Sequence, residues 1–583
     1  MNDESTGVVV DDGRSKLSDL WKKEDYWAIW LGFLVLIIGY VLFVAQMQPK
    51  FAETVDKANQ TMMASAEKAP FKTIEWHAAQ DSKKKLRARD NAEGKTIAAY
   101  TKTPGGWKDN PLDSFYIDKE TMDAANAKAK PAADSAKAAE AAALESAKVA
   151  QKAAEDAGYK DASLNSQAEA KIGDWRKAQS SASRANTRAT AKPMNLFPSL
   201  GAFMVVLIIF FGVGIVFMGH NVAQFALAFI GVFIFANLAF MMGAQATMRT
   251  YGINAEAWAI ILGMIVANTV GTPKFIKPAI QTEYYIKTGL VLLGAEVLFD
   301  KIIAIGIPGV FVAWVVTPIV LVSTFIFGQK VLKMPSKTLN ITISADMSVC
   351  GTSAAIATAA ACRAKKEELA LSIGLSLAFT AVMMIAMPAF IKAVGIPDIL
   401  GGAWIGGTVD STGAVAAAGA ALGEKAMYVA ATIKMIQNVL IGVTAFFVAL
   451  YWTTKVEPAE NGLPGRKVGM SEIWNRFPKF VIGFLIASIL ASMISGNLGS
   501  DLSGALVNEG LVRGIAGPMR TWCFVLAFTS IGLGTNFREL AHYFKGGKPV
   551  ILYVCGQSFN LVLTLTMAYI MFYLVFPEIT AKI

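Results

Sequence analysis

The chain has 583 residues, of which 54% are hydrophobic and 17% charged, and its mean hydropathy is +0.45. A soluble protein of this size would carry about 25% charged residues. Apolar runs of roughly 16 to 28 residues recur along the chain, long enough to cross a bilayer as helices. The sequence therefore predicts an all-α polytopic membrane protein, whose net charge of +10 reflects cytoplasmic loops and an extramembrane segment and implies no nucleic-acid partner.

Composition and motifs also argue against several kinds of site. The four cysteines all lie in or beside apolar runs, and neither they nor the three histidines have metal-ligand spacing. No G-x-x-x-x-G-K-[ST] stretch occurs, which argues against ATP hydrolysis. No nucleophile–base pair appears either. We expect no enzymatic activity, no catalytic residues, no metal centre and no cofactor, with Na⁺ considered only as a coupling ion.

The first apolar run is predicted to be an uncleaved transmembrane helix. Residues 1–25 form a polar tail, and residues 26–45 form the helix, preceded by Lys22 and Lys23. A cleaved signal peptide is the alternative, but the run is long for one, and "VAQMQPK" is a poor cleavage site. The N-terminus is therefore expected in the cytoplasm.

Residues 46–195 differ in composition from the rest of the chain, being polar and rich in Ala, Lys, Glu, Asp and Ser. The stretch "AAEAAALESAKVAQKAAEDAG" (138–158) consists of strong helix formers, and Gly158 suits a turn. The sequence predicts a helical hairpin or coiled-coil insert. If the first helix crosses the membrane, this insert is extracytoplasmic. We expect a structural element there rather than chemistry.

Residues 196–583 are predicted to form the transporter core. Its apolar spans are 197–218, 222–244, 256–271, 284–299, 302–327, 338–362, 367–394, 399–422, 424–452, 478–496, 514–534 and 546–576. Together with the first helix, these make about thirteen transmembrane or re-entrant segments.

Basic residues test the orientation of these spans. Three loops carry them: Lys330, Lys333 and Lys337; Lys455, Arg466, Lys467 and Arg476; and Arg538, Lys545 and Lys548. Alternating crossings from a cytoplasmic N-terminus place all three loops inside. Arg363, Lys365 and Lys366 would then fall outside, which indicates that 338–362 does not cross as a simple helix.

Two parts of the core, about 256–327 and 478–576, share weak similarity. "ILGMIVANTVG" (261–271) resembles "ILASMISGNLGS" (489–500), and "LLGAEVLFDK" (292–301) resembles "SIGLGTNFRE" (530–539). Corresponding spans are seven segments apart, and an odd shift implies opposite orientation. Such inverted-topology repeats are typical of secondary transporters with discontinuous helices near the midplane. Asn268, Asn497 and Asn536 are predicted to cap broken helix ends.

The candidate site lies in two polar segments, 340–368 and 407–438. Each begins with one acid, Asp346 or Asp410, followed by hydroxyls, a glycine and a run of small residues. A carboxylate in the hydrocarbon region is costly, so it is seldom retained without a function. Glycine permits unwinding, and unwound backbone offers carbonyls to cations and N–H groups to anions. Close helix packing is the alternative explanation for the alanines, and an interfacial position is the alternative for Asp346.

Lys434 lies within the apolar stretch "VAATIKMIQNVLIG" and needs a carboxylate, a substrate anion or water, unless it snorkels. Glu296 is either a counter-ion or a structural partner. The predicted ion-coupling residues are Asp410, Asp346, Thr412 and Ser411. The predicted substrate-binding residues are Lys434, Cys350, Gly351, Thr352, Ser353, Gly413 and Asn438.

The motifs "SVCGTSAAIATAA", "KKEELALSI", "AWIGGTVDSTGAVAAAG", "GEKAMYVAATIKM" and "IGLGTNFREL" resemble the sulfate exporter (YeiH-type) family of bacterial membrane proteins over about 197–576. That family is grouped with cation–proton antiporters and bile-acid sodium symporters. The resemblance implies a bundle of inverted repeats, with Cys350, Gly351, Ser353 and Ala354 in a family motif and Lys434 matching the family lysine. Asp410, Ser411 and Thr412 depart from the histidine-containing pattern of many members, and the insert is not typical of the family.

These observations predict a multi-pass secondary transporter of the bacterial cytoplasmic (inner) membrane. It would move a small, anionic solute, sulfate-like or a small organic acid, coupled to H⁺ or Na⁺. The expected partners are this solute, the coupling ion and the lipid bilayer, and a homo-oligomer is compatible with the prediction. Two alternatives remain: a passive anion channel of the same fold, and a membrane receptor or scaffold acting through the insert.

Overall fold

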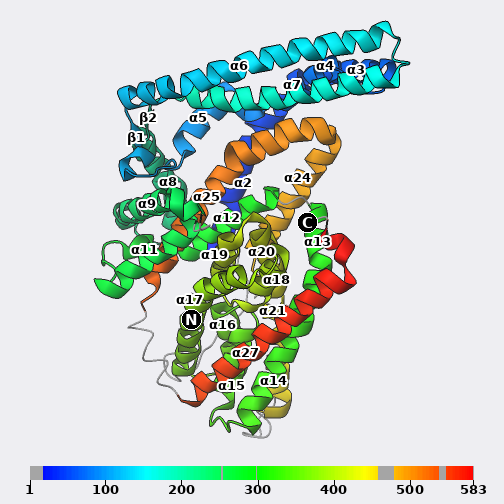
Figure 1. Cartoon of the computed structure of the whole chain (residues 1–583). Coiled ribbons are helices and arrows are strands. Elements are labelled where there is room, and N and C mark those ends of the chain that lie inside the picture. Colours follow the sequence, from blue (N-terminus) through cyan, green and yellow to red (C-terminus); the bar gives the residue numbers. More distant parts are fainter. Residues whose placement is uncertain (1–16, 251–253, 297–298, 457–477, 537–546, 582–583) are drawn as a thin grey trace. The chain divides into compact units, whose positions relative to one another are not determined.

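The computed structural model describes residues 17–250, 254–296, 299–456, 478–536 and 547–581, which are almost entirely helical (Figure 1). Five of the basic residues that test the orientation lie outside these ranges: Arg466, Lys467, Arg476, Arg538 and Lys545. The chain divides into two compact units. The core unit comprises the described parts of Met1–Leu34, Met204–Ser492 and Met519–Ile583. The insert unit comprises Val35–Phe203 and Met493–Pro518.

The insert unit is a set of amphipathic helices with one very short sheet. Its α-helices are α3 (Gln48–Lys68), α4 (Ile74–Lys84), α5 (Ala92–Thr101), α6 (Lys119–Asp156) and α7 (Ala162–Ala189). Its other helices are η1 (Tyr40–Ala45), η2 (Ala88–Asp90), η3 (Pro111–Ser114) and η7 (Ser503–Ala516). Strands β1 (Tyr116–Ile117) and β2 (Met194–Asn195) pair antiparallel, with Tyr116 opposite Asn195.

Helices α6 and α7 run side by side as a long hairpin (Figure 1). Alanine-rich faces permit this close approach, and the two helices bury Ala147, Ala154 and Ala168 together with Trp175. The turn passes through Gly158 at φ 62°, a left-handed conformation that glycine adopts without a Cβ clash. The Asp161 carboxylate then accepts hydrogen bonds from the first N–H groups of α7.

The segment 493–518 belongs to the insert unit, although it joins two apolar spans of the predicted core. Helix η7 packs its glycine face against the insert: a Cβ on Gly510 or Gly514 would meet the Phe43 side chain. Arg89 also forms a 3.0 Å ion pair with Glu509 of η7. The insert unit is therefore assembled from two distant parts of the sequence.

The core unit contains the remaining helices. In chain order these are α1 (Asp19–Lys22), α2 (Glu24–Gly39), α8 (Phe197–Phe217), α9 (Val222–Ala244), α10 (Ala246–Thr250), α11 (Ala255–Thr269), η4 (Lys277–Ala279), α12 (Thr282–Glu296), α13 (Phe299–Val310), η5 (Phe311–Val315), α14 (Val316–Lys330), α15 (Lys337–Ser348), α16 (Thr352–Cys362), α17 (Lys366–Val394), α18 (Asp398–Thr408), α19 (Thr412–Leu422), α20 (Glu424–Asn438), α21 (Leu440–Tyr451), η6 (Trp452–Val456), α24 (Phe480–Leu502), α25 (Gly517–Gly534), α27 (Lys548–Tyr569), η9 (Ile570–Val575) and α28 (Pro577–Thr580). Helices α2, α8, α24 and α25 each lie partly in the insert unit.

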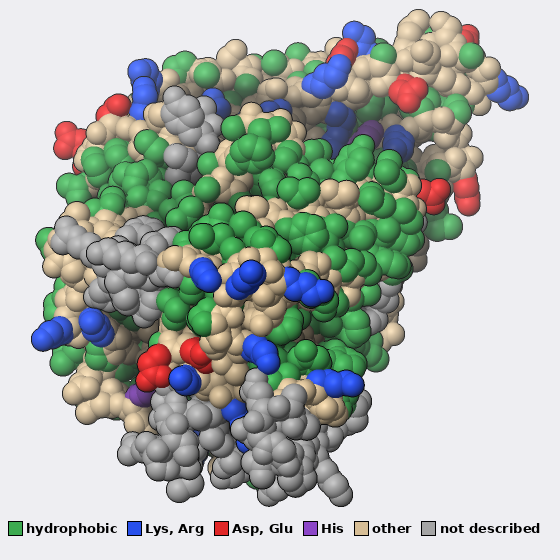
Figure 2. Space-filling view, turned by 90° about the horizontal axis from the view of Figure 1, so that it is seen from below, with side chains coloured by type: hydrophobic (Ala, Val, Ile, Leu, Met, Phe, Trp, Pro, Cys, Tyr) green, Lys and Arg blue, Asp and Glu red, His purple; other side chains and the backbone are tan. Residues whose placement is uncertain are grey.

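Eight helical stretches among the described residues are long and apolar enough to cross a membrane. They are Glu24–Ala45, Phe197–Phe217, Val222–Ala244, Ile305–Lys330, Glu367–Val394, Glu424–Val456, Phe480–Gly534 and Lys548–Val575. Large apolar side chains such as Ile209 and Val562 are more than 60% exposed, and Figure 2 shows broad areas of hydrophobic side chains on the face it presents. Such exposure suits a lipid environment and not water, so the chain is an all-α multi-pass membrane protein. The predicted count of about thirteen segments and the inverted repeat stay predictions.

Two of the predicted spans are interrupted helices. Span 338–362 consists of α15 and α16, separated at residues 349–351, where Gly351 has φ 66°. Span 399–422 consists of α18 and α19, separated at residues 409–411. We call residues 349–351 and 409–411 the two interruptions. A Cβ on Gly351 would lie 3.3 Å from the Cβ of Asp410, so the two interruptions lie against each other.

Helices from the two segments of similar sequence, 256–327 and 478–576, contact each other at glycines. A Cβ on Gly263 of α11 would meet the backbone of Gly532 in α25, and a Cβ on Gly294 of α12 would meet the Phe484 carbonyl of α24. Asn268 donates a 2.9 Å hydrogen bond to the Thr535 carbonyl, just beyond the end of α25. Asn497 is exposed and lies two residues before Gly499, where α24 has a non-helical φ of 72°.

Candidate functional site

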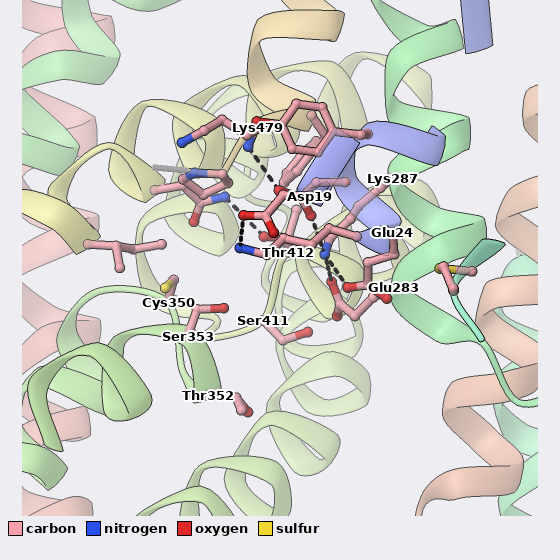
Figure 3. A pocket seen from close by; sticks show the side chains of 18 of the residues that line it. Asp19, Glu24, Glu283, Lys287, Cys350, Thr352, Ser353, Ser411, Thr412 and Lys479 are labelled. Carbon is pink, nitrogen blue, oxygen red and sulfur yellow. Dashed lines mark hydrogen bonds and ion pairs between the residues drawn. The ribbon is translucent and has the colours of Figure 1, made fainter. Parts of the chain in front are cut away.

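Helices α16 and α19 begin at the wall of one cavity of about 510 Å³ in the core unit. Six of the predicted site residues line it: Cys350, Thr352, Ser353, Ser411, Thr412 and Asn438. Figure 3 shows Thr352, Ser353, Ser411 and Thr412 around this space. Thr352 and Ser353 open α16, Thr412 opens α19, and Ser411 directly precedes α19. The first N–H groups of both helices therefore lie near the same cavity. Those N–H groups have no partner within their own helix.

The neutral part of the cavity wall consists of hydrogen-bonding groups. The Ser411 hydroxyl caps α19 by accepting a 3.2 Å bond from the Ala414 N–H. The Asn438 side-chain amide donates a 3.1 Å bond to the Thr412 hydroxyl, which links α20 to the first residue of α19. Helix N-termini carry partial positive charge, and hydroxyl and amide groups donate hydrogen bonds, so this wall is suited to a small anion.

The other part of the wall is ionic and comes from α1, α2, α12 and the residues before α24. The Lys287 ammonium of α12 contacts Glu24 at 2.5 Å, Asp25 at 2.8 Å and Glu283 at 3.6 Å. The Lys479 backbone N–H donates a 2.8 Å bond to Asp25. Figure 3 shows Glu24, Glu283, Lys287 and Lys479 on the side of the cavity away from Thr352. The network ties α2, α12 and the residue before α24 together, and none of its residues was predicted as part of the site.

The two predicted coupling acids lie behind this cavity, buried in protein. Asp410 is 1% exposed and accepts a hydrogen bond from the Tyr553 hydroxyl of α27, and Thr380 Oγ1 lies 3.5 Å from the same carboxylate oxygen. Asp346 is 0% exposed, accepts a 2.6 Å bond from Ser372, and its Oδ1 atom has no hydrogen-bond partner. Neither acid forms an ion pair with a described basic side chain. Each is therefore a candidate for binding a proton or a cation.

A row of hydroxyls on α17 connects the surroundings of the two acids. Ser372, Ser376 and Thr380 are spaced at i, i+4 and i+8, which places them on one face of the helix. Ser372 bonds Asp346, Thr380 lies near Asp410, and a Cβ on Gly351 would lie 3.1 Å from Ser376 Oγ. None of these three hydroxyls is among the predicted site residues, although their spacing within an apolar span is visible in the sequence.

Lys434 does not pair with Asp410. It is 1% exposed, and its ammonium donates 2.8 Å hydrogen bonds to the Val349 carbonyl and to the Gln437 side chain. Lys434 is also absent from the cavity wall, whereas both Gly351 and Gly413 are next to residues that line it. The buried lysine is thus attached to the end of α15.

Glu296 forms a 2.9 Å ion pair with Arg520 of α25, and its carboxylate side chain is only 3% exposed. The Tyr428 hydroxyl of α20 lies 3.4 Å from the other carboxylate oxygen. Of the two roles considered for Glu296, these contacts favour a structural partner that joins α12, α20 and α25. Asn536 lies just beyond α25 and does not line the cavity.

Comparison with known proteins finds a family for this chain. The model of the family described as Conserved hypothetical protein 698 matches residues 210–553. Two proteins of Nitratidesulfovibrio vulgaris, both named UPF0324 membrane protein, are 68% and 67% identical to this chain over 583 residues, covering the whole of each chain. A UPF0324 membrane protein of Rhodopirellula baltica is 56% identical over 399 residues, which is 67% of this chain and 72% of the relative. No solved structure gives a significant match.

Proposed function

We propose that this chain, which belongs to the UPF0324 membrane protein family, is a secondary active transporter of a small anionic solute. The observation that carries the proposal is the meeting of two interrupted helices, whose second halves begin at one cavity. Interrupted helices in a membrane place polar backbone where a substrate can reach it, and many secondary transporters use them this way.

The chemistry of the cavity supports an anion as the substrate. The starts of α16 and α19 supply N–H groups and positive helix-dipole ends, and Thr352, Ser353 and Thr412 supply hydroxyls. A volume of about 510 Å³ leaves room for a compact anion with some of its water. A sulfate-like ion or a small organic acid fits these features.

Asp410 and Asp346 are proposed to carry the coupling ion, H⁺ or Na⁺. Both are buried without a basic partner among the described residues. Asp410 lies in one interruption, and the Asp346 carbonyl accepts a 2.9 Å hydrogen bond from the Gly351 N–H in the other. A change in their charge would alter the electrostatic potential at the neighbouring helix starts. Binding of the ion and binding of the anion would then be linked reciprocally.

The cavity wall also supports the proposed orientation in the cytoplasmic (inner) membrane. Lys23, His220 and Lys479 all line it, and alternating crossings from a cytoplasmic N-terminus place the three corresponding segments on the cytoplasmic side. The cavity would then face the cytoplasm, and the insert would lie outside.

Counterflow in proteoliposomes tests transport directly. The purified protein is reconstituted and loaded with an unlabelled anion, and uptake of the same labelled anion is followed for sulfate, acetate and succinate in turn. A transporter gives a transient accumulation above equilibrium for its substrate. A passive channel gives equilibration without this overshoot, and that result would replace the proposal with the channel alternative.

A further inference from the structure

Lys434 lies at the end of an interrupted helix, where a transporter of this kind could hold a metal cation. Its ammonium donates to the Val349 carbonyl, directly after α15. The carbonyls at a helix C-terminus have no partner within the helix and carry partial negative charge. A buried ammonium at this place compensates that charge, as a bound Na⁺ otherwise would.

Three further carbonyls at these helix ends lie within hydrogen-bond distance of side-chain amides. At the end of α15, Gln437 Nε2 donates to the Ser348 carbonyl at 3.1 Å. At the end of α18, Gln437 Nε2 lies 3.3 Å from the Gly407 carbonyl, and Gln557 Nε2 donates to the Thr408 carbonyl at 3.0 Å. The carbonyls of Ser348, Val349 and Thr408 are therefore already occupied by side-chain donors.

The carboxylates nearby are the groups left to bind an ion. The titratable groups around the interruptions are Asp346 on α15, Cys350 and Asp410 in the interruptions, Lys434 on α20 and Tyr553 on α27. Tyr553 donates to Asp410, and its ring stacks on Phe379 with centroids 4.5 Å apart, which holds the hydroxyl in place. The hydroxyl row Ser372, Ser376 and Thr380 connects the two acids, and hydroxyls can both donate and accept a proton.

We propose that Lys434 is a built-in cation that takes the place of a bound Na⁺, so that the site uses protons alone, on Asp410 and Asp346. The inference rests on the proposed transport function. It goes beyond that function by specifying the coupling ion, H⁺ and not Na⁺. It assigns Lys434 as a positioning and selectivity residue, not as a ligand of the substrate. This also explains why the ammonium is attached to a helix end and is absent from the cavity wall.

Thermal unfolding of the purified full-length protein tests the assignment without a known substrate. The midpoint is measured in NaCl and in choline chloride at equal ionic strength, for the parent and for Lys434→Ala. Any ion that binds only the folded state raises the midpoint by mass action. We expect equal midpoints for the parent in both salts. For Lys434→Ala we expect a saturable, Na⁺-specific rise of a few degrees, since Na⁺ can then enter the vacated place.

Two further variants control this experiment. Lys425→Ala removes an exposed lysine from the same helix, α20, and should leave the midpoint independent of Na⁺. Lys434→Gln keeps an N–H donor without the charge. It replaces Lys434→Ala in the same measurement if the alanine variant does not fold. A saturable Na⁺-specific rise in the parent would overturn the proposal. The absence of any Na⁺ effect in a folded Lys434 variant would also overturn the assignment.

Transport assays separate this inference from the proposed function. If counterflow occurs, an inward proton gradient in Na⁺-free buffer should drive accumulation of the anion, and adding Na⁺ should not change its rate. A requirement for Na⁺ would overturn the inference while leaving the transporter intact. If no anion shows counterflow, the transport function fails, while the unfolding midpoints still decide whether Lys434 excludes Na⁺.

Discussion

Asp346, Asp410 and Lys434 at the interruptions are at most 1% exposed, whereas the charged groups of the hairpin α6–α7 lie largely in solvent. In the Lys148–Glu145 pair of the hairpin, for instance, both side chains are more than half exposed. Burying a charge costs several kcal/mol unless hydrogen bonds or a partner compensate it, while an exposed ion pair contributes only about 0–1 kcal/mol. The buried charged residues at the interruptions are therefore expected to have a function. The exposed charged residues of the hairpin are expected only to keep its surface solvated. Four predictions test this difference.

The largest effect is expected at Asp410. Asp410→Asn keeps the size of the side chain and removes its charge and its ability to bind a proton. We expect a folded, membrane-inserted protein whose gradient-driven transport is lost, with anion exchange retained. Uptake in proteoliposomes under an imposed ion gradient measures this. Asp174→Asn in the hairpin is the matched control and should behave as the parent, and accumulation by Asp410→Asn equal to that of the parent would make Asp410 a structural residue.

The second contrast compares two glycines. Gly351 has φ 66°, and an added Cβ would lie 3.1 Å from Ser376 Oγ and 3.3 Å from Asp410 Cβ, whereas a Cβ on Gly173 of α7 would meet nothing within 4 Å. Gly351→Ala should destabilise the protein by about 1–3 kcal/mol because of strain and reduce transport by displacing Asp410. Gly173→Ala should instead stabilise α7 by about 0.5–1 kcal/mol because helical alanine loses less backbone entropy.

Thermal unfolding reports the first change, and hydrogen exchange of the α7 amides reports the second. Equal stability of Gly351→Ala and the parent would mean that the interruption tolerates a side chain and is not tightly packed.

A smaller effect concerns the ion pair between Arg176 of α7 and Asp81 of α4. Two hydrogen bonds from the guanidinium, at 2.5 and 2.9 Å, hold the pKa of Asp81 below its ordinary value of 3.8. A lowered pKa in the folded state means that the pair stabilises the insert above about pH 4 and that this contribution is lost as the pH falls through the folded-state pKa. We expect a coupling of about 0.5–1 kcal/mol at neutral pH.

A double-mutant cycle of Asp81→Asn and Arg176→Gln, read by hydrogen exchange in α4 and α7, measures this coupling. A coupling of several kcal/mol would show that ion pairs in the insert unit contribute more than exposed pairs do. The contrast drawn above between the core unit and the hairpin would then fail.

The smallest effect on transport is expected from removal of the hairpin. Strands β1 and β2 pair just outside it, so its two ends are close together, and a short Gly/Ser linker can replace residues 119–189. We expect transport within about twofold of the parent, since the linker spans a short distance and the cavity lies in the core unit. Complete loss of function in a correctly inserted protein would favour the receptor or scaffold alternative.

Local chemistry in the sequence was enough to predict several features of the protein. Long apolar runs predict membrane helices because the bilayer requires both length and apolarity, and the Ala-rich stretch before Gly158 predicts the hairpin. The two interruptions were also foreseen, because a glycine or an acid with hydroxyls interrupts an apolar run in a way that can be read locally. Six of the predicted residues line the cavity for this reason.

Pairings between distant residues depended on the tertiary structure alone. Arg520 follows Glu296 by more than two hundred residues, and the sequence holds no local sign of that ion pair. The same is true of Tyr553 beside Asp410, and of Lys434, which meets the Val349 carbonyl and not Asp410. Composition and periodicity show that a buried polar group needs a partner, because an unsatisfied one is costly. Which partner it finds is decided by how the helices pack, since many arrangements would satisfy the same apolar pattern.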